Sequence, residues 1–181
     1  MACMEEIRGE LVELKCADEN DAQFSLDIRN DPTLTQFIPK VQGSLNGQIN
    51  WILNERKRPD SFFYIILNKE GKRLGTASLY DIDKKQSQAE FGRYISYGNA
   101  LENVEAALLI LDFAFNDLGV GTVLFNNDER NSKIISFWKR FGAQLQQIVE
   151  MNGWKAAQYW LEKENYFKQR EKIIALLARR S

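Results

Sequence analysis

The sequence contains no histidine, and this absence excludes several kinds of active site. A histidine general base, a triad that depends on histidine and a histidine-ligated metal all require the missing side chain. The two cysteines, Cys3 and Cys16, do not have the spacing of a thiolate metal site. We therefore expect no bound metal ion, and a chemistry that needs no histidine.

A large excess of charge of either sign is also missing. The chain has 24 Lys plus Arg residues and 25 Asp plus Glu residues, so its formal net charge is −1. Proteins dedicated to binding nucleic acid are usually strongly basic, although a local basic patch would be compatible with this balance. We expect no nucleic-acid partner.

Long apolar runs are absent as well. The longest nearly uncharged runs, such as Ala106 to Ile110, are far too short to span a bilayer. The N-terminal stretch from Met1 to Glu10 carries acidic residues and lacks the apolar core of a secretory signal. We expect no membrane partner, and a cytoplasmic location.

The residues that are present suit one globular domain covering residues 1–181, because 44% of them are hydrophobic. Strand and helix patterns mix along the chain without a repeat, a low-complexity tract or a linker. They predict an α/β fold with a central mixed, largely antiparallel sheet of about seven strands flanked by helices. Strands are expected at 10–15, 61–67, 74–80, 87–96, 120–125, 144–150 and 154–161, and helices at 18–29, 44–56, 101–118, 132–141 and about 165–179.

The stretch from Gln88 to Leu118 is the most informative part of the chain. Aromatic and β-branched residues predict a strand up to Ser96, and apolar residues at three-to-four spacing predict a long helix from Leu101. Gly98 lies in the turn between them, where it would let the backbone approach a ligand. The N–H groups and the dipole of a helix N-terminus attract anions. This turn is therefore a candidate phosphate-binding site.

The order of the predicted elements, over roughly Ile7 to Glu164, resembles the GNAT N-acetyltransferase fold. Several short phrases are similar to the branch that contains ribosomal-protein N-terminal, polyamine and amino-sugar acetyltransferases. The phrases are Arg29-Asn-Asp-Pro32, Leu74-Gly-Thr-Ala-Ser-Leu79, Ala89-Glu-Phe-Gly92, Gly98-Asn-Ala100 with Phe113-Ala-Phe115, and Asn131-Ser132 before Phe141-Gly142.

The resemblance implies that acetyl-CoA is the cosubstrate, with its pantetheine arm in a gap beside the central strand. Its pyrophosphate would lie at the following turn, whose last two fixed family positions match Gly98 and Ala100, whereas Ile95 replaces the family's Gln or Arg. Tyr94 and Tyr97 either line the cleft or are aromatic residues of the sheet surface. The residues implied to bind the cosubstrate are Tyr94, Ile95, Tyr97, Gly98, Asn99, Ala100 and Asn131, of which Asn131 could also cap the helix at Ser132.

The resemblance also implies a carboxylate near the amine acceptor, and Glu90 on the central strand is the candidate catalytic residue. A structural ion pair with a nearby Lys or Arg is the alternative role for Glu90. The family often has a tyrosine in the later helix that protonates the leaving thiolate, but this chain has Trp138 there. An indole cannot act as an acid of useful pKa, so core packing is the expected role of Trp138.

The expected function is therefore acetyl transfer from acetyl-CoA by direct attack of a primary amine on the thioester. The amine could belong to an amino sugar on a nucleotide carrier, to a small metabolite or to a protein N-terminus. Ile95 and Trp138 motivate a rival hypothesis, a non-catalytic module that binds or senses acyl-CoA. A homodimer is left open.

Overall fold

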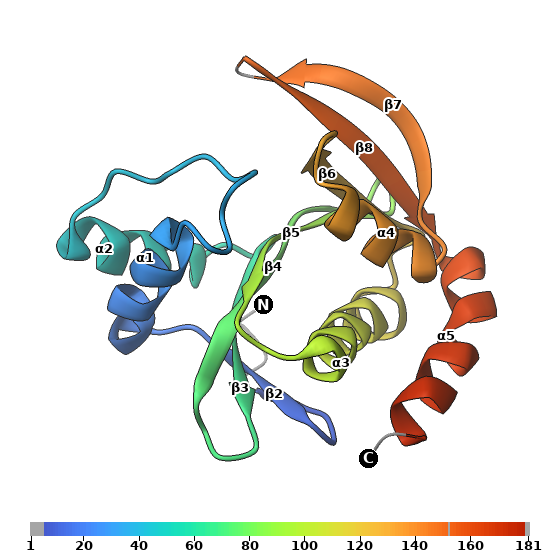
Figure 1. Cartoon of the computed structure of the whole chain (residues 1–181), viewed down its shortest axis with the longest axis horizontal. Coiled ribbons are helices and arrows are strands. Elements are labelled where there is room, and N and C mark those ends of the chain that lie inside the picture. Colours follow the sequence, from blue (N-terminus) through green and yellow to red (C-terminus); the bar gives the residue numbers. More distant parts are fainter. Residues whose placement is uncertain (1–5, 152, 180–181) are drawn as a thin grey trace.

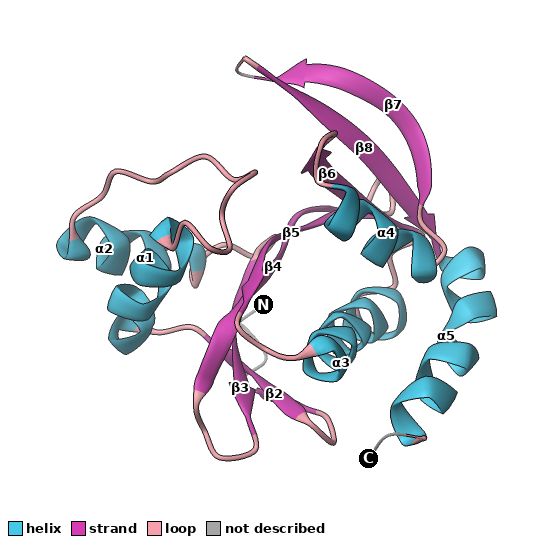
Figure 2. Ribbon diagram, viewed as in Figure 1, coloured by secondary structure: helices cyan, strands magenta, loops and turns pink. Residues whose placement is uncertain are grey.

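The computed structural model describes residues 6–151 and 153–179, which form one eight-stranded sheet with helices on both faces (Figures 1 and 2). The strand order is β1-β2-β3-β4-β5-β6-β8-β7, and every pair is antiparallel except β5 with β6. The predicted fold class is confirmed. The sheet has one strand more than the sequence predicts, because β1 (Glu6–Arg8) is too short to give a recognisable pattern.

The elements follow the predicted order, with small shifts at their ends. The strands are β1 (Glu6–Arg8), β2 (Val12–Cys16), β3 (Phe62–Asn68), β4 (Arg73–Asp83), β5 (Gln88–Ser96), β6 (Thr122–Asp128), β7 (Gln144–Met151) and β8 (Trp154–Glu162). The helices are α1 (Ala22–Asn30), α2 (Leu45–Glu55), α3 (Ala100–Asp112), α4 (Ser132–Arg140) and α5 (Lys163–Ala178), with a short 3-10 helix (Glu19–Asp21) before α1 and a π-helical turn (Phe113–Asp117) after α3. The predicted Asn-Gly turn between β7 and β8 includes Asn152, which lies outside the described residues.

Helices cover the two faces of the sheet unequally (Figure 1). A large core cluster joins one face of the sheet to α3, α4 and α5, and a smaller cluster joins β3 to α1 and α2 on the other face. Alternate residues of β3 therefore enter different clusters: Tyr64 packs in the large one and Phe63 in the small one. This burial on both faces explains the continuous apolar run of β3.

The sheet opens between β5 and β6, its only parallel pair. Pairing is limited to Gln88–Glu90 against Thr122–Leu124, and beyond Leu124 strand β6 pairs only with β8. On its other edge β5 contains a bulge, where Arg93 has a φ of 52°. The bulge turns β5 away from β6, and the two strands diverge in the direction of α3 (Figure 2).

Close approach of the β4 and β5 backbones explains why the Leu74–Leu79 segment contains a glycine. A side chain at Gly75 would clash with the carbonyl oxygen of Ile95, so only glycine fits at this point of β4. The neighbouring Thr76 donates a hydrogen bond from its hydroxyl to the carbonyl oxygen of Arg93, at 2.8 Å. The Leu74–Leu79 phrase thus holds the bulge of β5 in place.

Candidate functional site

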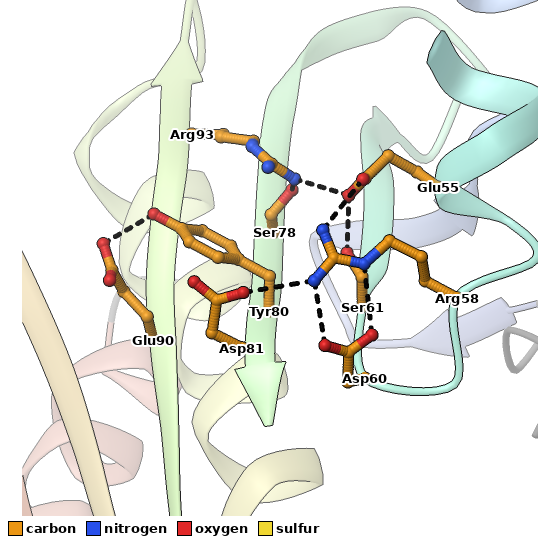
Figure 3. A network of polar contacts seen from close by, with 9 residues as sticks. All are labelled: Glu55, Arg58, Asp60, Ser61, Ser78, Tyr80, Asp81, Glu90 and Arg93. Atoms are coloured by element: carbon orange, nitrogen blue, oxygen red, sulfur yellow. Dashed lines mark hydrogen bonds and ion pairs between the residues drawn. The ribbon is translucent and has the colours of Figure 1, made fainter. Parts of the chain in front are cut away.

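Glu90 is the last residue of β5 that pairs with β6; its partner there is Leu124. The Tyr80 hydroxyl of the adjacent β4 donates a hydrogen bond of 2.6 Å to Oε1 of Glu90 (Figure 3). A Cβ at Gly92 would lie 2.5 Å from the Tyr80 hydroxyl oxygen, so the glycine gives the phenol room to reach Glu90. The partner of Glu90 is therefore a phenol, and not the Lys or Arg of the alternative role.

Tyr80 is a hydrogen-bond donor that stays protonated. Burial and the neighbouring Glu90 carboxylate both raise the pKa of its phenol far above the ordinary value. A protonated phenol next to Glu90 fixes the direction of the carboxylate without neutralising it. Glu90 itself is partly exposed.

Beside this pair, Arg93 and the buried Glu55 form a charged network that sequence reasoning missed (Figure 3). Arg93 extends from the bulge of β5 and donates to Oε2 of Glu55 at 2.8 Å, and the hydroxyl of Ser61 donates to the same oxygen at 2.6 Å. Burial opposes the charge of Glu55, but these hydrogen bonds outweigh it and lower its pKa. The guanidinium of Arg93 also lies 4.3 Å from the ring centre of Tyr80 and 4.9 Å from that of Trp51.

A cavity of about 250 Å³ opens on the same face of the sheet, between α1, α2 and the strands. Its lining consists of Ser25, Leu26, Arg29, Val41, Gln48, Trp51, Phe63, Thr76 and Arg93. The cavity thus has an aromatic and aliphatic wall and two arginines, and it contains no carboxylate. It touches the network around Arg93, which places it beside Tyr80 and Glu90.

The turn between β5 and α3 has its donors occupied by the chain itself. The N–H of Gly98 donates to the Ser96 hydroxyl at 2.9 Å, and the N–H of Asn99 donates to the Glu102 carboxylate at 2.8 Å. In return, the Asn99 side chain accepts from Leu101 and Glu102, completing a capping box. The sequence predicts that the N–H groups of Tyr97, Gly98, Asn99 and Ala100 are available to phosphates. In the structure the first three of these N–H groups donate to partners within the chain.

The capping box also shows that the turn suits an anion. The Glu102 carboxylate is a negatively charged acceptor at the N-terminus of α3, as a phosphate oxygen would be. A pyrophosphate could take its place if the side chain rotated away, because Glu102 is only partly buried. Beyond Glu90 the edge of β5 does not pair with β6, so its backbone groups and this turn, with Glu102 moved aside, offer the kinds of donor and acceptor that acetyl-CoA would need.

The other residues predicted on β5 differ in their exposure. The Tyr94 ring packs against Phe137 and Trp138, and its hydroxyl donates to the carbonyl oxygen of Asn103 at 2.7 Å. Burial raises the pKa of this phenol. Ile95 is buried on the face of the sheet that carries α1 and α2, opposite Thr76. What Tyr94 can offer a ligand is therefore its backbone.

Tyr97 connects the turn to the loop after α1. The ring is half exposed, and its hydroxyl donates to Oδ2 of Asp31 at 2.6 Å. This hydrogen bond raises the pKa of Tyr97 to about 12. The Arg29–Pro32 phrase thus has a structural role, since Asp31 ends α1 and holds the turn.

Asn131, the residue that precedes α4, and Trp138 within α4 have different roles. The carboxamide oxygen of Asn131 accepts from the N–H of Ile134 at 3.3 Å, which caps the helix and leaves its NH₂ group to donate to a ligand. Trp138 is 2% exposed and stacks on Phe125 with ring centres 4.4 Å apart. Its predicted role in core packing is confirmed. Among the described residues, no cluster of acidic and cysteine side chains could hold a metal ion.

A family model described as "Acetyltransferase (GNAT) domain" matches residues 11–144 of the chain. The match covers well over half of the 181 residues. The chain therefore belongs to the GNAT acetyltransferase family, whose members use acetyl-CoA, and its domain is that of an N-acetyltransferase. No curated protein matches the sequence.

Solved structures agree with this assignment. The apo structure of FdhC, described as a nucleotide-linked sugar GNAT, is 26% identical with a TM-score of 0.83, and the match covers 95% of this chain and 98% of that chain. A GCN5-related N-acetyltransferase from Brucella melitensis is 16% identical with a TM-score of 0.79, covering 95% and 85%. A spermidine N-acetyltransferase from Vibrio cholerae, in complex with CoA and spermine, is 14% identical with a TM-score of 0.78, covering 88% and 99%. The last two likenesses show the shared fold alone.

No helix in residues 6–151 and 153–179 combines the length and the apolar character that a membrane span requires.

Proposed function

We propose that this protein transfers the acetyl group of acetyl-CoA to a primary amine, with Glu90 as the group that accepts the proton of the amine. The observation that carries this proposal is the Glu90 carboxylate at the point where β5 and β6 separate, held by the Tyr80 hydroxyl at 2.6 Å. An alkyl amine has a pKa near about 10, so it is mostly protonated at neutral pH. A fixed carboxylate beside the acceptor would help to remove that proton, directly or through a water molecule.

Most of the remaining rate enhancement would come from positioning. Acetyl-CoA supplies an activated thioester, which an amine can attack without a protein nucleophile, and this suits a chain that has no histidine. Correct alignment of two reactants is worth up to about 7–11 kcal/mol. The edge of β5 beyond Glu90, which does not pair with β6, would supply backbone groups for the pantetheine arm. The turn would supply the N–H of Asn99 to the pyrophosphate once the Glu102 side chain has rotated away from it. Tyr94, Ile95 and Tyr97 would contribute backbone, and Asn131 its NH₂ group.

The leaving thiolate would take its proton from water. Trp138 is buried in an aromatic cluster and has no acidic proton to give. A thiol with a pKa near about 8.5 is a tolerable leaving group at neutral pH, so this step makes small demands. The position of Trp138 is thus compatible with catalysis.

For the acceptor, we favour an amino sugar on a nucleotide carrier over a small amine or a protein N-terminus. The support is the likeness to FdhC, whose described substrates are nucleotide-linked sugars and which is 26% identical over nearly the whole chain. The cavity beside Arg93 has room for a part of such an acceptor. The cytoplasmic location stays a prediction.

A non-catalytic acyl-CoA-binding module is the second candidate. The observation that favours it is Trp138, which is buried in the aromatic core at the position where the family often has an acidic tyrosine. Such a module would bind acetyl-CoA and release no CoA in the presence of amines.

The experiment that tests the role of Glu90 is the pH dependence of turnover in Glu90→Gln. The variant keeps the size of the side chain and an acceptor for Tyr80. At pH 7 its kcat/KM should fall on the order of 100-fold, and the loss should shrink as rising pH increases the fraction of free amine. Glu70→Gln, in the exposed turn between β3 and β4, is the matched control. Equal pH profiles for Glu90→Gln and wild type would show that Glu90 has no role as a base.

A further inference from the structure

Arg29 is a partly buried cation for which the described part of the protein supplies no anion. Its Nε is buried without a hydrogen-bond partner, and no described residue forms an ion pair with its guanidinium. The side chain extends from the last turn of α1 into the lining of the cavity of about 250 Å³. Because a polar group buried without a hydrogen-bond partner is costly, the Nε–H of Arg29 needs an explanation.

The other polar groups of the cavity all have partners within the chain. Gln48 donates to the Ser25 hydroxyl at 3.0 Å, and Ser25 donates to the carbonyl oxygen of Ala22 at 2.9 Å. The Thr76 hydroxyl donates to the backbone of Arg93, and the guanidinium of Arg93 is paired with Glu55. Arg29 is therefore the polar side chain of this lining that has no partner within the described chain and could bind a ligand.

The charges around Arg29 indicate that a ligand bound to it would be negatively charged. Burial and the charge of Arg93 both lower the pKa of Arg29, so the two guanidinium groups lie close enough to repel each other. The Glu55 carboxylate is bound to Arg93, and the lining contains no carboxylate for Arg29. An anion that entered the cavity would relieve the repulsion and accept hydrogen bonds from the planar fork of Arg29.

We propose that the cavity binds an anionic group of the amine acceptor, a phosphate or a carboxylate, through Arg29. This rests on the proposed function, because it assigns the cavity to the acceptor of the acetyl group. The geometry links the two ends of such an acceptor: Arg93 lies over the ring of Tyr80 at 4.3 Å, and Tyr80 holds Glu90. The amine would face Glu90 while the anionic group occupies the cavity on the same side of the sheet.

The assignment narrows the acceptor to amines that also carry a negative charge. A polyamine would bring positive charge to a lining with two arginines, and it would be rejected. The volume of the cavity corresponds to roughly eight water molecules at about 30 Å³ each, enough for a phosphate with part of a sugar. Phosphate esters and carboxylates share the chemistry that Arg29 recognises, so the experiment must separate them.

The test compares matched amines that differ in one anionic group. Glucosamine 6-phosphate against glucosamine tests the phosphate, 4-aminobutyrate against butylamine tests the carboxylate, and spermidine tests the polyamine. CoA release is measured for wild type, Arg29→Gln and the control Arg8→Gln, whose arginine is exposed on β1.

In wild type, at least one anionic amine should have a kcat/KM about tenfold or more above that of its neutral partner, mainly because its KM is lower. In Arg29→Gln that ratio should fall towards one, while Arg8→Gln should keep it. The pair that shows the effect identifies the anion.

A binding measurement keeps the inference separate from the proposed function. Calorimetry with glucosamine 6-phosphate, in the presence of CoA, should give heat of binding for wild type and Arg8→Gln and at least tenfold weaker binding for Arg29→Gln, with folding of each variant checked by circular dichroism. If no amine yields free CoA but this binding pattern holds, the proposed function fails and the anion site stands. Equal kcat/KM for the members of both pairs, or equal binding by folded Arg29→Gln and wild type, would overturn the inference.

Discussion

Single side chains at this site depend on neighbours that are distant in the sequence. Glu90 is directed by Tyr80 across the β4–β5 pair, and Tyr80 can reach it because Gly92 has no side chain. The phenol in turn lies under the guanidinium of Arg93. A carboxylate held in this way needs little reorganisation when an amine approaches, which is the benefit of a preorganised base.

Replacing Tyr80 with phenylalanine should separate positioning from packing. Tyr80→Phe keeps the ring under Arg93 and removes only the hydroxyl that donates to Glu90. We expect kcat to fall by about tenfold, or about 1.4 kcal/mol of barrier, because the carboxylate loses its fixed orientation. The KM for the amine should change little. Steady-state kinetics with CoA release as the readout measures both constants.

An unchanged kcat in Tyr80→Phe would contradict a positioning role for the phenol. Phe63→Leu, which alters the apolar wall of the cavity and leaves the pair of Tyr80 and Glu90 untouched, is the comparison variant. It should raise KM for the acceptor more than it lowers kcat.

At the residue scale, the sequence indicated Glu90 and Trp138 and missed Arg29, Glu55 and Glu105. The buried Glu105 of α3 accepts hydrogen bonds from the N–H groups of Glu10, Leu11 and Val12, which fixes the turn between β1 and β2. The contacts of Glu55 and Glu105 join segments far apart in the chain, and the lack of a partner for Arg29 depends on which distant segments surround it. A charged residue in a helix pattern gives no sign of such a partner, so the pattern alone could not reveal them.

At the scale of elements, the N-terminus of α3 carries a conflict between folding and ligand binding. The Asn99–Glu102 capping box satisfies N–H groups that would otherwise be orphaned, and it contributes to the stability of the helix. It also puts a negative charge where we expect the pyrophosphate of acetyl-CoA. The sequence shows Asn99 and Glu102 at the spacing of a capping box, but the prediction for this turn included only its backbone N–H groups and not the Glu102 side chain.

Neutralising Glu102 should therefore tighten CoA binding. In Glu102→Gln the amide can still accept from the N–H of Asn99, while the negative charge is removed. Two charges about 4 Å apart in water interact by about 1 kcal/mol, so we expect CoA affinity to rise about fivefold. Thermal stability should fall slightly, since an acidic residue in the first turn favours the helix dipole. Calorimetry with CoA measures the affinity.

The control for this prediction is Glu164→Gln, in the first turn of α5 and away from the turn at Gly98. It removes the same charge and should leave CoA affinity unchanged. A Glu102→Gln variant that binds CoA more weakly than wild type would show that the pyrophosphate lies elsewhere.

At the scale of the whole molecule, the order of elements was predictable because each has a strong local signal. The apolar run of β3, the spacing of α3 and the Ser44 cap of α2 are all present in the structure, whereas Asp18 caps the short 3-10 helix that precedes α1. The divergence of β5 from β6 was not visible from local patterns. It depends on the bulge at Arg93, where a residue other than glycine has a positive φ, and on the pairing of β6 with β8. Only the resemblance to the family pointed to it.

The arrangement of the two layers separates the tasks of the molecule. The face that carries α3, α4 and α5 holds the large core, and the face that carries α1 and α2 holds the cavity, Arg29, Tyr80 and Glu90. Beyond Glu90 and Leu124 the strands β5 and β6 no longer pair, so Glu90 lies where the β5 edge becomes free of β6.

The most direct test of the central claim is the release of free CoA thiol by the wild-type protein. Purified protein is incubated with acetyl-CoA and a panel of primary amines that includes amino sugars, nucleotide-linked amino sugars, polyamines and a peptide with a free N-terminus. We predict amine-dependent thiol release, with the acetylated amine detected by mass spectrometry, and a loss on the order of 100-fold in Glu90→Gln at pH 7. Tight binding of acetyl-CoA without thiol release from any amine would contradict the account and support the non-catalytic module.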